Sequence, residues 1–155
     1  MNGLKITIAN PVVSPREPLL VSGEVWFTLG DKDFPAAHWT DSPVSVLGSL
    51  CEAIDSAEKG EVGEVYFFDG PYYVKLVPGP ADGRGEVEAI AVCDRAGQIS
   101  GTGEGVAEAR CHVSLDSMRA QYTNLLGDLE GWARQHGHAE VAEQLSRMVR
   151  HPRRT

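Results

Sequence analysis

The segment that most constrains the fold of this chain is residues 64–77, which read EVYFFDGPYYVKLV. Two runs of aromatic and β-branched residues flank Asp69-Gly70, a pair that readily supplies the positive φ angles of a hairpin turn. Pro71 has no backbone N–H to donate, so we expect a connection somewhat longer than two residues. Because five of the eight Phe and Tyr residues lie here, this hairpin should carry much of the apolar area of a sheet.

The remaining chain shows the patterns of further strands, one inserted helix and two late helices. Alternating apolar residues predict strands at 4–9, 19–29, 86–94 and 109–115, with a short returning strand near Phe34. A 3.6-residue repeat predicts helices at 43–59, 116–135 and about 141–149, and loops are expected at 10–18, 78–85 and 96–105. Ser42 and Pro43 form a typical helix start. We therefore predict a single α+β domain over residues 1–155, with a mostly antiparallel sheet of about five or six strands.

The charge of the chain narrows the classes of partner. The net charge of −8 argues against a general nucleic-acid binder. Residues 1–146 hold all 22 acidic residues and ten basic ones, a balance of −12, whereas four arginines make residues 146–155 basic. We expect this tail to be a helix end followed by a frayed terminus. No signal peptide and no apolar run of membrane-spanning length is visible, so we expect no membrane contact and a cytoplasmic location.

Three cysteines, Cys51, Cys93 and Cys111, lie far apart inside predicted helices or strands. Free, buried thiols in a reducing compartment are the expected state. Cys111 precedes His112, but adjacent residues of a strand point to opposite faces. These two side chains therefore cannot form a catalytic dyad with each other.

Two further patterns suggest ligands but lack a specific spacing. One is a set of glycines after a predicted strand: Gly97, Gly101, Gly103 and Gly105. This segment has no lysine for a phosphate-binding loop and no following helix for a dinucleotide site, so we interpret it as a hairpin connection. The other is a set of possible metal ligands: Asp31, Asp33, His38 and Asp41. Turn formation and helix capping explain these residues as well, and we expect no metal and no cofactor.

The strongest candidate for a binding surface is the predicted outward face of the strand at 19–29. Glu24, Trp26 and Thr28 alternate with apolar residues there, and Trp39 is close in sequence. If the C-terminal helices cover this face, these residues are structural. If the face is open, an exposed tryptophan among acidic residues is typical of a protein-binding hot spot.

Two short motifs carry a resemblance. His38-Trp39-Thr40-Asp41 before the first helix and Phe68-Asp69-Gly70-Pro71-Tyr72 after it resemble a pattern in uncharacterised small actinobacterial proteins, over residues 20–80. In size and acidity the chain is also similar in type to the immunity proteins of toxin–immunity pairs. This resemblance of type implies a protein inhibitor rather than an enzyme.

From these observations we predict a non-catalytic protein-binding module, of the immunity type, that recognises a basic partner. The alternative is a small enzyme or ligand binder with a pocket near His38, Asp41 and Asp69. We also predict a homodimer through the C-terminal helices. The short last helix needs a partner for its apolar stripe, and the single stripe of the helix at 116–135 is needed to cover the sheet.

Overall fold

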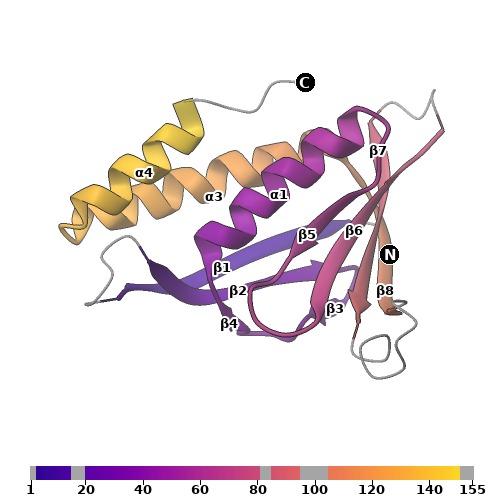
Figure 1. Cartoon of the computed structure of the whole chain (residues 1–155), viewed down its shortest axis with the longest axis horizontal. Coiled ribbons are helices and arrows are strands. Elements are labelled where there is room, and N and C mark those ends of the chain that lie inside the picture. Colours follow the sequence, from indigo (N-terminus) through magenta and orange to yellow (C-terminus); the bar gives the residue numbers. More distant parts are fainter. Residues whose placement is uncertain (1–2, 15–19, 81–84, 95–104, 151–155) are drawn as a thin grey trace.

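The computed structural model describes residues 3–14, 20–80, 85–94 and 105–150, and of residues 149 and 150 it describes the backbone alone. These residues form two antiparallel sheets and three helices (Figure 1). The elements are, in order, β1 (Leu4–Val13), β2 (Val21–Leu29), β3 (Lys32–Phe34), β4 (Thr40–Asp41), α1 (Pro43–Glu58), β5 (Gly63–Tyr66), β6 (Tyr72–Pro78), β7 (Glu86–Cys93), β8 (Val106–Ser114), α3 (Leu115–Gln135) and α4 (Ala139–Arg150). The predicted α+β class is confirmed, with one helix between strands and two after them.

The first sheet has the order β1-β2-β3, and β4 also pairs with β2. Along β2 the buried Val25 and Phe27 alternate with partly exposed residues, and α1 and α3 lie on one side of this sheet (Figure 1). β1 continues to Val13, although a loop was predicted from residue 10. A register shift between Ala9 and Val12 takes up Pro11, which lacks a backbone N–H, so pairing resumes beyond it.

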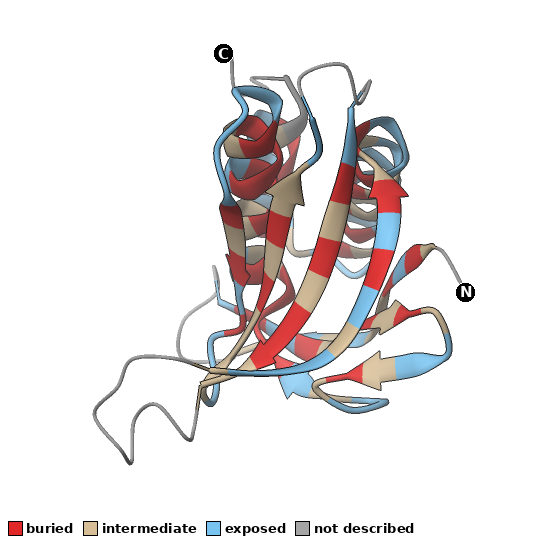
Figure 2. Cartoon of the chain, turned by 90° about the vertical axis from the view of Figure 1, so that its right-hand side faces the viewer, coloured by how far each residue is buried: buried red, intermediate tan, exposed pale blue. Residues whose placement is uncertain are grey.

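The second sheet has the order β5-β6-β7-β8. The predicted hairpin is confirmed, with Tyr66 opposite Tyr73 and a connection that contains Gly70 at a φ of +77°. Its strands alternate between buried and more exposed residues (Figure 2), which leaves one face toward the core and the other toward solvent. β7 lies in the interior of the sheet, as its apolar residues on both faces predicted.

The prediction of one sheet with five or six strands is corrected to two sheets of four. The short strand predicted near Phe34 is β3, whereas β4 has only two residues, too few for an alternating pattern to reveal it. The two sheets meet near the start of β1, where the Gly3 N–H donates to the His112 carbonyl at 3.0 Å. Alternation along a strand predicts its faces but not which strands pair.

The core lies where α1 covers both sheets. As predicted, the Ser42 side chain caps α1 by accepting the Ser45 N–H, and Pro43 occupies the first helical position. Aromatic rings join the sheets: Phe67, between β5 and β6, packs edge-to-face against Phe27 and Phe34 at centroid distances of 5.6 and 6.0 Å. These contacts fix the β5–β6 hairpin against the first sheet.

The helix α4 packs against α3 within the same chain, with Val141, Ala142 and Leu145 fully buried. The stripe that led to the prediction of a homodimer therefore has its cover inside one molecule. α3 is joined to α1 by Arg119, which lies 2.8 Å from Glu58 and 3.3 Å from Asp55. None of the described helices combines the length and apolar character that a membrane span requires.

Helix side chains form hydrogen bonds with the backbone of one edge strand in each sheet. On β1, the Gln121 amide of α3 accepts the Ile6 N–H and donates to the Leu4 carbonyl, each at 2.8 Å. On β5, the Ser49 hydroxyl of α1 accepts the Tyr66 N–H at 2.8 Å. Exposed backbone edges of this kind would otherwise pair with other chains.

Candidate protein-binding surface

Asp41 organises the loop of the β5–β6 hairpin. It is only 4% exposed, at the end of β4, and its two carboxylate oxygens accept four hydrogen bonds. The donors are the Ser42, Phe68 and Asp69 backbone N–H groups and the Trp39 indole N–H, at 2.7 to 3.1 Å. A carboxylate accepts about four hydrogen bonds, so that of Asp41 is fully used in fixing this loop.

The loop that Asp41 holds presents Phe68 to solvent. The Phe68 side chain is 77% exposed, although Phe67 beside it is buried. Phe68 and Leu20, which is 45% exposed, border a hollow of about 210 Å³ between the hairpin loop and the start of α1. A large apolar side chain held outward by an ordered backbone is typical of a protein-binding site.

The outward face of β2 adjoins this hollow. Thr40 lines the hollow and lies opposite Glu24 in the strand register, so its side chain shares the outward face with Glu24 and Trp26. The helices lie on the other side of this sheet (Figure 1). We call the set of Leu20, Glu24, Trp26, Thr28, Thr40 and Phe68 the outer-sheet surface; Thr40 links its β2 residues to the hollow.

The polar groups of the outer-sheet surface are held by their own neighbours. Glu24 lies 2.8 Å from the His38 Nδ1 and accepts a hydrogen bond from Asn10 at 3.2 Å. The hydrogen bonds from His38 and Asn10 lower the pKa of Glu24 below its ordinary value. The His38 ring also packs against Trp26 at a centroid distance of 4.9 Å. The result is a partly apolar surface whose carboxylate, that of Glu24, is held by neighbouring side chains.

Trp39 does not lie on this surface with the other three predicted residues. Its carbonyl accepts the Val25 N–H at 2.8 Å, and its ring packs edge-to-face against Tyr72 in the second sheet at 5.2 Å. It is partly buried against the core. Its role is to seat the loop before α1, together with Asp41.

The structure brings together two of the three residues of the alternative ligand site, Asp41 and Asp69, which both line the hollow. His38 pairs with Glu24, whereas Asp41 binds the backbone of residues 68 and 69. Asp69 lines the hollow beside Phe68 and contributes its backbone N–H to Asp41. His38 therefore lies apart from the other two residues, and the Asp41 carboxylate already accepts hydrogen bonds from backbone and indole donors.

The possible metal ligands are likewise dispersed. Asp33 accepts the Thr28 hydroxyl at 2.7 Å, Asp31 is exposed, and His38 and Asp41 have the partners given above. In the described part of the chain, no three His, Cys, Asp or Glu side chains are grouped as a metal site. The glycines at 97, 101 and 103 lie outside the described residues.

The cysteines are free thiols, as predicted; Cys51 and Cys111 are buried, whereas Cys93 is only half-buried. Cys111 is buried and His112 is exposed on the opposite face of β8. Burial raises the pKa of the Cys111 thiol, so this residue is poorly suited to act as a nucleophile.

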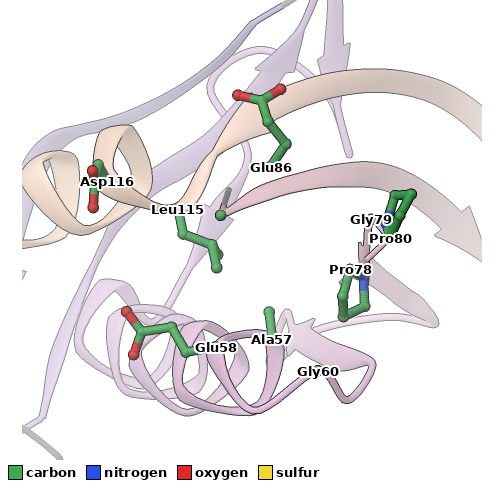
Figure 3. Close-up of a pocket in the computed structure, with 10 residues that line it drawn as sticks. Ala57, Glu58, Gly60, Pro78, Gly79, Pro80, Glu86, Leu115 and Asp116 are labelled. Atoms are coloured by element: carbon green, nitrogen blue, oxygen red, sulfur yellow. The ribbon is translucent and has the colours of Figure 1, made fainter. Parts of the chain in front are cut away.

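A second cavity, of about 260 Å³, lies between the end of α1, the end of β6, the start of β7 and the start of α3 (Figure 3). Glu58, Glu86 and Asp116 line it, and Glu58 is already paired with Arg119. Its described lining residues include no His, Cys, Ser, Thr or Lys. The cavity thus adds to the acidic surface without indicating a reaction.

Comparison of the chain with protein-family models, with curated proteins and with solved structures gave no match. The resemblance carried by the motifs at residues 38–41 and 68–72 therefore stays a prediction. The geometry of the surface is the basis for the functional proposal.

Phe68 and Leu20 were not among the residues predicted for the binding surface, although Phe68 belongs to the motif at residues 68–72. A usable signal was present for Phe68: neighbouring residues of an extended segment point to opposite sides, so Phe67 and Phe68 cannot both enter one core. No such signal exists for Leu20, because its exposure depends on how the chain enters β2.

Proposed function

We propose that this chain is a non-catalytic protein-binding module of the immunity type, which inhibits a basic intracellular protein by binding it through the outer-sheet surface. The exposure of Phe68 carries this proposal. Its backbone N–H is fixed by Asp41 at 2.9 Å, so the phenyl ring is presented to solvent by an ordered loop. An apolar anchor that is positioned before binding loses little conformational entropy when a partner covers it.

Charge supports the choice of a basic partner. The chain has a net charge of −8, and Glu24 and Asp69 flank the apolar part of the outer-sheet surface and its hollow. Opposite charge on a partner would speed association and select its orientation. The apolar anchors would supply most of the affinity.

Co-purification tests the proposal. The tagged chain, expressed in its own cells, should retain one protein at a stoichiometric ratio, which native mass spectrometry measures. Phe68→Ser should reduce the retained partner at least about tenfold, because a buried aromatic anchor contributes about 2 kcal/mol or more. Val62→Ser is the matched control, because Val62 is a 52% exposed apolar residue that does not line the hollow.

Three outcomes would contradict the proposal. One is a chain that carries a bound small molecule or metal in place of a protein, which would favour the enzyme or ligand-binding alternative. Another is equal loss of the partner in the Phe68 and Val62 variants. For the immunity type, the retained partner must also arrest growth when it is expressed alone, and co-expression of this chain must restore growth.

A further inference from the structure

A third cavity, of about 380 Å³, lies on the solvent side of the β5–β6 hairpin. Its lining includes the carboxylates of Glu64 and Asp94 and the phenol rings of Tyr66 and Tyr73. Tyr66 and Tyr73 lie opposite each other in the strand register, with ring centroids 5.5 Å apart and planes inclined by 37°. We call this cavity the tyrosine hollow.

The tyrosine hollow is an electronegative environment. Tyr66 donates its hydroxyl to Glu64, and this hydrogen bond raises the pKa of Tyr66 to about 12. Burial raises the pKa of Tyr73, and the charges of Glu64 and Asp94 raise it further. Lys75 lies opposite Glu64 in the register and offsets part of this negative charge. Two carboxylates against one ammonium leave the site negative.

The carboxylate of Asp94 adds negative charge to the tyrosine hollow. Its backbone N–H donates to the Pro71 carbonyl at 2.7 Å, which fixes the residue beside the hairpin connection. Its Oδ1 is buried and has no hydrogen-bond partner among the described residues. This oxygen is closed to the hollow, so Asp94 acts on a ligand there through the negative charge of its carboxylate, which favours a cationic group.

We propose that the tyrosine hollow binds an arginine side chain of the partner protein. A guanidinium group is planar and can lie against the tyrosine rings while its N–H groups reach carboxylates. A lysine ammonium matches the charge but cannot stack or form a bidentate contact. This inference rests on the proposed function, because it supplies the residue by which a basic partner is recognised. Tyr66, which is 52% exposed, is two residues from Phe68 on the same hairpin.

An NMR titration of the full chain with three short peptides tests the inference. The peptides are Ac-Gly-Arg-Gly-NH2, its citrulline isostere and its lysine counterpart. The arginine peptide should shift the ring signals of Tyr66 and Tyr73 in a saturable manner. The citrulline and lysine peptides should bind at least about fivefold more weakly, since cation–π and paired-carboxylate contacts are lost or reduced.

Two substitutions in the tyrosine hollow locate the binding site. Asp94→Asn and Tyr66→Leu should each weaken the arginine peptide at least about threefold. Glu140→Gln removes the same charge as Asp94→Asn from an exposed position at the start of α4, and it should leave binding unchanged. If Asp94→Asn does not fold, Tyr66→Leu gives the same test at an exposed position of an edge strand.

Two results would overturn the inference: equal binding of the arginine and citrulline peptides, or equal weakening by Glu140→Gln and Asp94→Asn. Equal weakening by these two variants would show that the peptide is attracted only by the overall negative charge of the protein. Failure here leaves the proposed function standing if a partner is retained through Phe68. Conversely, saturable arginine binding by a chain that retains no protein would support the hollow and contradict the proposed function.

Discussion

At the residue scale, Gly127 and Gly63 differ in the space available for an added side chain. Gly127 lies in the interior of α3, and a Cβ added there has no atom within 4 Å. Gly127→Ala should raise the free energy of unfolding by about 1 kcal/mol, because alanine favours the helix. Gly63→Ala should lower it, since its Cβ would lie 2.3 Å from the Ala53 carbonyl oxygen of α1. Urea unfolding of both variants measures this contrast, and a loss of stability in Gly127→Ala would contradict it.

The carboxylate of Glu24 gives a residue-scale prediction in pH. Its pKa in the folded chain lies below the ordinary value of 4.5, first because of the hydrogen bond with His38. A carboxylate with a lowered pKa stabilises the fold above its unfolded-state pKa, and this contribution is lost as the pH falls through the folded-state value. Glu24→Gln should therefore destabilise the chain above pH 4.5, with a difference that shrinks in stronger acid.

Urea unfolding between pH 3 and pH 6 measures this difference in the free energy of unfolding. Glu140→Gln, at an exposed position of α4, is the matched control and should show little pH-dependent difference. A constant difference between Glu24→Gln and the native chain across this range would show that Glu24 acts only through packing.

At the element scale, the edge of β1 depends on one side chain of α3. Gln121→Ala should lower the free energy of unfolding by about 1–3 kcal/mol, because the Ile6 N–H and the Leu4 carbonyl lose their partners. It should also promote association, since an open strand edge pairs with other chains. Urea unfolding and light scattering measure the two effects. Thr123→Ala, at an exposed position of the same helix, should show neither, and equal behaviour of the two variants would refute this role for Gln121.

At the scale of the whole molecule, the packing of α4 bears on the predicted homodimer. Because Leu145 is fully buried within one chain, Leu145→Ala should cost about 2–5 kcal/mol, and the unfolding midpoint should not depend on protein concentration. Arg147→Ala, on the exposed side of α4, should cost little. A midpoint that rises with concentration would show that the folded chain associates with a second copy. Light scattering of the full chain tests a dimer formed through any other surface.

Periodicity and turn chemistry in the sequence predicted much of the fold. Alternation located the long strands, and Ser42-Pro43 located the start of α1, because these signals act between residues close in the chain. The site was predicted only in part. Glu24, Trp26 and Thr28 face outward as the alternation of β2 required, but Trp39 turns toward Tyr72 because its orientation depends on the second sheet.

The sequence by itself determined the α+β class, the hairpin around Asp69-Gly70, the free cysteines and the acidic character of the chain. These properties follow from local conformational preference and from composition. Only the tertiary structure decided that the strands form two sheets, that α4 covers α3, and that Asp41 holds Phe68 outward. Each of these depends on contacts between residues far apart in the chain, such as the 27 positions that separate Asp41 from Phe68. Their free energies come from packing and burial in three dimensions, which no local pattern encodes.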